Sequence, residues 1–175
     1  MIKRIVSYDF DGTLCFTPEP LEGEKIWEKE TGTVWPYRGW WSKKESLDMN
    51  IFDIPVNQFV YRKYLEDVVR KEESKDTFIL LATGRIEKLR KEVELVLNHH
   101  NLSFDMVSLN PGMNTLDFKI KLFEKLIEKY NPEVFVMYDD RHQHLVEFEK
   151  WAETQPCRIE IIDVTKSDKT PKIIN

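Results

Sequence analysis

Three short groups of polar residues each follow an apolar, strand-like run of the chain. They are Asp9-Phe10-Asp11-Gly12-Thr13, Thr83-Gly84-Arg85 and Asp139-Asp140-Arg141. Carboxylates bind hard divalent cations and can act as nucleophiles, whereas hydroxyl and guanidinium groups bind anions. If the three groups meet in the folded chain, they can hold a metal ion and act on an anionic substrate.

Asp9 and Asp11 are two residues apart, so their side chains share a face if the strand stays regular, and Gly12 lets the backbone turn away tightly. The same Asp-x-Asp-Gly pattern begins some calcium-binding loops, which require a glutamate at the twelfth position. Counted from Asp9, that position is Pro20. The apolar run before Asp9 also favours catalysis over calcium binding.

The other two groups predict an anion site and a cation site. Thr83 and Gly84 precede a predicted helix, whose free N–H groups would bind an anion together with the Thr83 hydroxyl. The alternative is that Thr83 is only a helix N-cap. Two adjacent carboxylates after a buried strand are costly unless they are paired or bound to a metal. A helix cap explains one of Asp139 and Asp140 but not both, so we expect a metal site, and the sequence leaves open which of them contacts the ion.

A lysine is expected to join these groups. Lys119 lies in the first turn of a predicted helix over 116–129 and could neutralise a phosphate and keep Asp9 ionised. Lys121 and Lys125 compete for this role, because most lysines on an amphipathic helix are solvated. His142 and His144 follow the paired aspartates and could reach the substrate or the metal.

The elements that must position these residues alternate along the chain. Short apolar runs predict five strands, and amphipathic segments predict helices near 57–73, 85–99, 116–129 and 141–153. This alternation predicts an α/β fold with an open, doubly wound parallel sheet, whose functional residues lie at the carboxyl ends of the strands. The predicted strands are Ile5–Phe10, Phe78–Ala82, Met106–Leu109, Val134–Tyr138 and Ile159–Val164.

One stretch breaks the alternation. We predict a single domain over 1–175 with a cap-like insertion at 16–75, after the first strand. Residues 35–44, WPYRGWWSKK, contain no acidic residue, and Arg38, Trp40 and Trp41 combine positive charge with aromatic faces, as single-stranded nucleic acid requires. The alternative is that these tryptophans form the core of the cap.

Composition excludes several other classes of protein. The formal net charge of −5 argues against broad, non-specific adhesion to nucleic acid. No apolar run is long enough to span a bilayer, and the N-terminus enters a strand pattern without a signal region. The two cysteines form no CxxC pair, which favours a reducing compartment. We expect a cytoplasmic protein without a membrane partner, and a loosely held terminus over 166–175.

The order of the motifs is similar to that of the haloacid dehalogenase (HAD) superfamily, with Asp-x-Asp-Gly-Thr, then Thr-Gly, a helical lysine and paired aspartates. The resemblance implies a Rossmann-like sheet in the order 5-4-1-2-3. It also implies a phosphatase in which Asp9 takes the phosphoryl group as an aspartyl-phosphate and Asp11 acts as general acid and base. Thr83 and Lys119 are expected to bind the phosphoryl oxygens.

The resemblance further implies the cofactor Mg²⁺. It would be held by Asp9, Asp140 and the backbone carbonyl of Asp11, with the second of the paired aspartates favoured as ligand. Asp139 would orient the metal shell or Lys119.

A narrower resemblance points to the Swiss Army Knife RNA repair-like branch of the superfamily and to the 3′-phosphatase domain of bacteriophage polynucleotide kinase. It rests on Thr17-Pro18-Glu19-Pro20, Trp27, Gly39-Trp40-Trp41, Ser46-Leu47 and the sequence Asp140-Arg141-His142-x-His144. It implies removal of a terminal 3′ phosphate from a polynucleotide, with Gly84, Arg85 and Arg141 also contacting the substrate. The chain has no GxxxxGK[ST] kinase loop and no KxDG ligase motif, so a kinase or ligase partner would be separate.

Two alternatives use the same scaffold. One is a phosphatase for a small metabolite or nucleotide, with the same catalytic residues and a different role for the cap. The other is a non-catalytic binding module, against which the full set of catalytic side chains argues.

Overall fold

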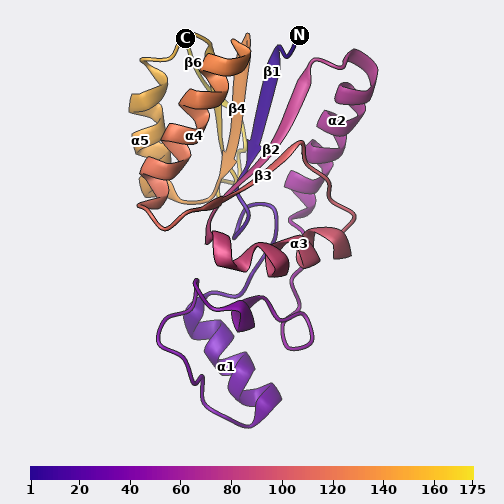
Figure 1. Ribbon diagram of the computed structural model, residues 1–175, viewed down its shortest axis with the longest axis vertical. Coiled ribbons are helices and arrows are strands. Elements are labelled where there is room, and N and C mark those ends of the chain that lie inside the picture. Colours follow the sequence, from indigo (N-terminus) through magenta and orange to yellow (C-terminus); the bar gives the residue numbers. More distant parts are fainter.

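The computed structural model describes residues 1–175 and contains one six-stranded sheet in the order β3-β2-β1-β4-β5-β6 (Figure 1). The first five strands are parallel, and β6 runs antiparallel to β5. The predicted order of the five core strands is therefore confirmed. The strands are β1 (Arg4–Tyr8), β2 (Thr77–Ile86), β3 (Met106–Asn110), β4 (Val134–Asp139), β5 (Arg158–Asp163) and β6 (Lys172–Ile174).

The strand β6 corrects the prediction of a loosely held terminus. Its residues pair with β5, Ile174 opposite Ile159, and the Asn175 side chain donates to the carbonyl oxygen of Ala152 at 2.8 Å. The short, charged sequence before β6 gives no apolar run, which is why its pairing was not expected from sequence.

Helices cover both faces of the sheet. α4 and α5 lie on one face, and α2 and α3 pack on the other (Figure 1). None of the helices combines the length and apolar character needed to cross a membrane. The helical elements are α1 (Pro20–Thr31), η1 (Lys44–Leu47), α2 (Gln58–Ser74), η2 (Glu87–Leu89), α3 (Arg90–His99), α4 (Thr115–Tyr130) and α5 (His142–Ala152).

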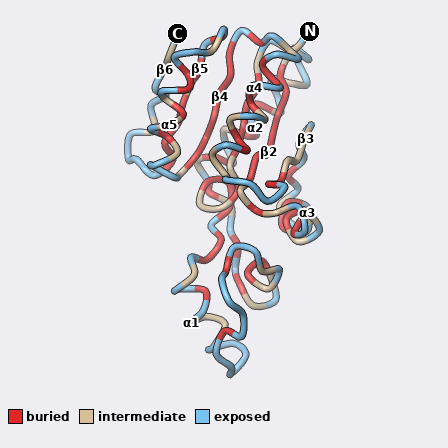
Figure 2. Tube along the Cα trace, turned by 60° about the vertical axis from the view of Figure 1, so that its left-hand side comes forward, coloured by how far each residue is buried: buried red, intermediate tan, exposed pale blue.

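Successive residues of the central strands point to opposite faces, and both faces are buried. Ile5 of β1 packs in the cluster beneath α4 and α5, whereas its neighbour Val6 packs in the cluster beneath α2 and α3. Both side chains are fully inaccessible to solvent. This explains why the strands read as continuous apolar runs, and Figure 2 shows the buried residues following the strands.

The segment 16–57, which we call the cap segment, extends beyond the carboxyl ends of the strands and contains α1 and η1 (Figure 1). The rest of the predicted insertion is mainly α2, which packs against β2. The chain enters and leaves the cap segment through a paired neck. There, Phe16 N–H donates to Pro55 at 2.8 Å and Asn57 N–H donates to Leu14 at 2.9 Å.

The cap segment has a small aromatic core. Trp40 is 3% exposed, its ring lies 4.6 Å from that of Trp35 and 5.6 Å from that of Phe52, and its indole N–H donates to Pro18. A Cβ on Gly23 of α1 would overlap the Trp40 ring, so glycine is required where α1 crosses it.

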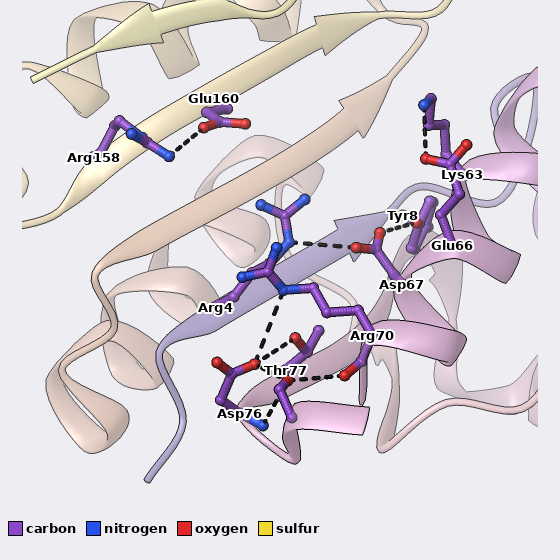
Figure 3. Close-up of polar contacts among 11 residues, drawn as sticks. Arg4, Tyr8, Lys63, Glu66, Asp67, Arg70, Asp76, Thr77, Arg158 and Glu160 are labelled. Carbon is purple, nitrogen blue, oxygen red and sulfur yellow. Dashed lines mark hydrogen bonds and ion pairs between the residues drawn. The ribbon is translucent and has the colours of Figure 1, made fainter. Parts of the chain in front are cut away.

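A polar clamp fastens α2 to β1 (Figure 3). The Tyr8 hydroxyl donates to the buried carboxylate of Asp67 at 2.6 Å, and Arg4 Nε donates to the same carboxylate at 3.3 Å. The Tyr8 ring stacks on Tyr138 of β4 with centroids 4.9 Å apart. Tyr8 and Tyr138 each precede a carboxylate of the site described next, so their stacking aligns the ends of the two strands.

Candidate active site

A cavity of about 530 Å³ opens at the carboxyl ends of the strands, between the sheet and the cap segment. Most of the site residues predicted from sequence line it. Those residues are Asp9, Asp11, Trp41, Gly84, Arg85, Lys119, Asp139, Asp140 and Arg141. Glu19, Thr115 and His144 also line it. Trp41 is the one hydrophobic residue of the lining, which suits a site for a charged substrate.

Three carboxylates converge in this cavity. Each of Asp9, Asp139 and Asp140 places an oxygen within 4.8 Å of the other two. The backbone makes this approach possible, because Gly12 has φ +71° and a Cβ at this position would lie 2.9 Å from Cγ of Asp140. The glycine of the Asp-x-Asp-Gly motif therefore provides both the turn and the space for the carboxylate that arrives from β4.

Lys119 lies between two of the carboxylates. Its Nζ is 2.9 Å from Oδ1 of Asp9 and 2.6 Å from Oδ2 of Asp139, and the residue is 2% exposed. Lys121 and Lys125 are exposed on α4. Of the three lysines considered from sequence, the structure thus brings Lys119 into the cavity.

The lysine does not balance the negative charge. Burial raises the pKa of Asp9 to about 8, Lys119 opposes this rise, and the charges of Asp139 and Asp140 add to it. Burial and the charge of Asp139 also raise the pKa of Asp140. Burial lowers the pKa of Lys119, but Asp139 and Asp9 together outweigh burial and raise it. Ionising all three carboxylates around one ammonium leaves two uncompensated negative charges, which a divalent cation would neutralise.

The donor set fits a hard cation of this kind. Both carboxylate oxygens of Asp139 already accept hydrogen bonds, Oδ2 from Lys119 and Oδ1 from the Arg141 N–H at 2.9 Å. Asp140 has only a 3.3 Å hydrogen bond from Thr13, and Asp9 keeps one oxygen free of Lys119. Asp9 and Asp140 therefore each have an oxygen without a partner that a hard cation could use, whereas Asp139 holds Lys119.

Asp11 is held by a buried arginine. Arg85 donates to Asp11 from Nε and from Nη2, the latter at 2.8 Å, and the Thr17 hydroxyl donates to Oδ1 of Asp11 at 2.7 Å. Arg85 was predicted to bind substrate. In the structure it is 2% exposed, and its guanidinium is bound to protein groups.

The start of the helix after β2 differs from the prediction. β2 continues to Ile86, with an irregular register against β3 between Thr83 and Ile86, and α3 begins only at Arg90. Thr83 is therefore not at a helix N-terminus. It is fully buried, its hydroxyl accepts from the Arg85 N–H at 3.1 Å, and it does not line the cavity.

Gly84 reaches the cavity with its backbone. A Cβ there would lie 2.8 Å from Cγ2 of Thr115, so glycine permits α4 to approach β2 closely. Thr115 is the first residue of α4, which Asn114 caps by accepting from the N–H groups of Leu116 and Asp117. A hydroxyl and a helix N-terminus thus face the cavity from α4 rather than from α3.

The three predicted substrate-binding residues of the cap segment have different environments. Trp40 is in the cap core and does not line the cavity, whereas Trp41 is 36% exposed and does. Arg38 is exposed but lies outside the cavity lining. Trp40 therefore fits the interpretation as cap core, whereas Trp41 has a surface open to the cavity.

The remaining cavity residues had only weak signals in the sequence. Arg141 is exposed, and its Nη1 lies 3.4 Å from Nε2 of His144, whose pKa is lowered by burial and by Arg141. Glu19 and Thr115 carried no prediction of contact with the cavity, because no periodicity shows which residues of an irregular loop or a first helical turn face inward. Cys15 is fully buried, and burial raises the pKa of its thiol to about 12, so it is unsuited to nucleophilic attack.

Comparison with known proteins gives a family match over most of the chain. Residues 19–173 match the model of HAD domain family 1 in Swiss Army Knife RNA repair proteins. The match begins after the Asp9–Thr13 motif and includes the cap segment from Glu19, Lys119 and the paired aspartates.

Individual relatives are more distant. An uncharacterized protein of Saccharomyces cerevisiae is 27% identical over 178 residues, which cover 95% of this chain and 37% of that protein. The structure of the Pnkp1/Rnl/Hen1 complex matches with a TM-score of 0.57 and 19% identity, over 89% of this chain and 44% of that one. A HAD-superfamily hydrolase, subfamily IA, from Geobacter sulfurreducens matches with a TM-score of 0.46 and 14% identity, over 90% of this chain and 85% of that one. The chain thus spans less than half the length of the yeast protein and of the matched chain in the complex.

Proposed function

Because the chain belongs to HAD domain family 1 of the Swiss Army Knife RNA repair proteins, we propose that it is a magnesium-dependent phosphomonoester hydrolase. We further propose that its substrate is the terminal phosphate of a polynucleotide, with the phosphate at the 3′ end. The observation that carries the proposal is the placement of Lys119 between Asp9 and Asp139, with Asp140 beside them at the floor of the cavity.

The first step is phosphoryl transfer to the protein. An oxygen of Asp9 attacks phosphorus and forms an acyl-phosphate bond while the bond from phosphorus to the ester oxygen breaks. Asp11 donates a proton to the departing oxygen, which leaves as an alcohol. Lys119 balances the charge of the phosphoryl group during transfer, and the Thr115 hydroxyl and the Gly84 backbone line its binding site.

The second step is hydrolysis of the aspartyl-phosphate. Asp11, now ionised, takes a proton from water, the water oxygen attacks phosphorus, and the bond between phosphorus and Asp9 breaks. Inorganic phosphate leaves and Asp9 is restored as a carboxylate. A bound Mg²⁺ would be held by Asp9, Asp140 and the Asp11 backbone carbonyl, and it would supply positive charge to offset the repulsion between the carboxylates and the phosphate.

The polynucleotide substrate is supported by the cavity wall that the cap segment contributes. Trp41 presents an exposed indole at the cavity, and Arg141, which also lines the cavity, presents an exposed cation. Stacking on an aromatic face and neutralisation of the phosphate backbone are the two features of single-strand binding. Trp40 and Thr83 do not line the cavity and so do not belong to this surface.

The chain contains no kinase or ligase motif. Those activities, if they accompany phosphate removal, would come from separate proteins or segments.

The test is phosphate release in the presence of Mg²⁺ from a panel of substrates. It contains oligonucleotides with a 3′ or a 5′ phosphate, mononucleotides and sugar phosphates, and it is repeated with a chelator. We expect fastest release from the 3′-phosphorylated oligonucleotide and none with the chelator. Hydrolysis of small molecules alone would replace the polynucleotide by a metabolite, and inactivity on the whole panel would indicate a binding module.

A further inference from the structure

Arg85 forms hydrogen bonds both to the cap segment and to Asp11, the proposed acid and base. Its Nη1 donates to the carbonyl oxygen of Trp41 at 2.9 Å and to the hydroxyl of Ser46 at 2.7 Å, and its guanidinium carbon lies 4.9 Å from the centre of the Trp41 ring. Nε and Nη2 are bound to Asp11. One side of the guanidinium therefore holds the cap segment, and the other holds the proposed acid and base.

The two partners of Arg85 in the cap segment are Ser46 and Trp41. Ser46 is fully buried, and its hydroxyl also donates to the carbonyl oxygen of Lys43 at 2.7 Å. Because that hydroxyl hydrogen is used, the Ser46 oxygen is free to accept from Arg85. Trp41 lines the cavity and is 36% exposed, whereas Ser46 is buried in the cap segment.

On the catalytic side, Arg85 distinguishes the two oxygens of Asp11. Oδ1 accepts from the Thr17 hydroxyl and from Nε and Nη2 of Arg85, whereas Oδ2 accepts only from Nε, at 3.0 Å. Oδ2 therefore keeps the free lone pair that can carry a proton to or from the reacting centre. The planar fork of the guanidinium fixes the orientation of the carboxylate as a single ammonium could not.

We propose that Arg85 is a positioning residue that aligns Asp11 for proton transfer only when the cap segment is seated over the cavity. It acts through Asp11 and does not touch the substrate, because it is almost fully buried and its guanidinium nitrogens are bound within the protein. This inference rests on the proposed phosphatase function. It adds that the acid–base step depends on contact with the cap.

A specific consequence concerns the leaving group. An alkoxide needs a proton to depart, whereas a thiolate is a much weaker base and departs without one. Misalignment of Asp11 should therefore slow cleavage of a P–O ester far more than cleavage of a P–S ester. A merely structural or substrate-binding role for Arg85 would slow both reactions equally.

The experiment compares two oligonucleotides that differ in one atom, one ending in a 3′-phosphate and the other in a 3′-S-phosphorothiolate. For Arg85→Lys, which keeps the charge but loses the fork, we expect kcat/KM to fall about 100-fold on the oxygen ester, within the range of general acid catalysis. On the sulfur ester, we expect kcat/KM to fall by less than about 10-fold.

Ser46→Ala provides a second variant that leaves every donor to Asp11 in place. It should lower the ratio of kcat/KM on the oxygen ester to kcat/KM on the sulfur ester, by a smaller factor than Arg85→Lys does. Thermal unfolding will show whether each variant folds, and Ser46→Ala still tests the proposal if Arg85→Lys does not fold. Equal losses on both esters, or an unchanged ratio in the folded variants, would overturn the positioning role while the phosphatase function stands. If wild-type protein releases phosphate from neither ester nor any other phosphorylated substrate, the proposed function fails and this inference with it.

Discussion

The Nζ of Lys119 lies 2.9 Å from Oδ1 of Asp9, so the ammonium of a side chain from α4 partly neutralises the carboxylate that follows β1. The same ammonium is shared with Asp139 at 2.6 Å. Since one positive charge serves two carboxylates and Asp140 has none of its own, the site is electrostatically incomplete without a cation. The predictions on the pH dependence of stability and on Asp140→Asn follow from this imbalance.

Asp9→Asn should abolish phosphate release, with a loss of at least about 10⁴-fold in kcat, because an amide oxygen cannot form the acyl-phosphate. The fold should persist, since Asn has nearly the same volume and Lys119 retains Asp139 as a partner. Steady-state kinetics and circular dichroism will check both points. Magnesium-dependent turnover in the purified variant would exclude Asp9 as the nucleophile.

The stability of the metal-free protein should fall as the pH rises. The pKa of Asp9 is raised from 3.8 to about 8 by burial, so folding favours the protonated form, and this advantage is lost as the pH climbs through that window. Asp140 shifts in the same direction. Thermal unfolding with a chelator should show the wild type losing stability relative to Asp9→Asn between about pH 4 and 8, as linkage requires. Added Mg²⁺ should reverse the loss at the upper end; a wild type that gains on the variant across this window would contradict the assignment.

Asp140→Asn should raise the Mg²⁺ concentration needed for half-maximal activity by at least about tenfold, the loss typical of disturbed metal sites. Asp139→Asn is the matched comparison, because Asp139 is bound by Lys119 and by the Arg141 N–H. Its main effect should fall on kcat, through a misplaced Lys119. A larger effect on magnesium dependence from Asp139→Asn than from Asp140→Asn would reverse the two roles.

Tyr8→Phe should lower the free energy of unfolding by about 1–3 kcal/mol, because it removes a hydrogen-bond donor from the buried carboxylate of Asp67. Tyr138→Phe is the control: it keeps the ring stack and removes a hydroxyl that makes no hydrogen bond within the protein. Urea unfolding of both variants will compare them. Equal destabilisation would mean that packing, rather than the hydrogen bond to Asp67, dominates the clamp.

Trp41→Ala should weaken binding of a 3′-phosphorylated oligonucleotide by roughly 5- to 150-fold, the range for loss of one stacked base. The effect should appear in KM for the oligonucleotide and be much smaller for inorganic phosphate as a competitive inhibitor. A Trp41→Phe variant should recover most of the affinity, because it restores an aromatic face. Unchanged oligonucleotide affinity in Trp41→Ala would remove the stacking role.

Sequence reasoning was most successful where backbone geometry alone determines position. Asp9, Asp11, Asp139 and Asp140 follow strands that are parallel, and parallel strands end at one edge, so their convergence required only the strand order. Lys119 could be predicted as a candidate but not separated from Lys121 and Lys125, because that choice depends on which side of α4 meets the sheet.

The rest depended on tertiary packing that no local pattern encodes. The irregular end of β2 turns Arg85 toward Asp11 and the cap segment, whereas the sequence predicted a helix from residue 85 and a substrate contact for Arg85. Trp40 and Trp41 are adjacent in an irregular loop, so nothing in their spacing shows that the first enters a core and the second faces the cavity. Strand β6 forms because β5 offers it a free edge, a tertiary effect that its own sequence does not predict.

The paired neck of the cap segment has a consequence for how this protein could open and close. Because Phe16 is hydrogen-bonded to Pro55 and Asn57 to Leu14, the two chain segments that carry the cap segment lie side by side, and a tilt of the cap that kept both hydrogen bonds would move the two segments together. A cross-link between these two segments should therefore leave such a tilt undisturbed.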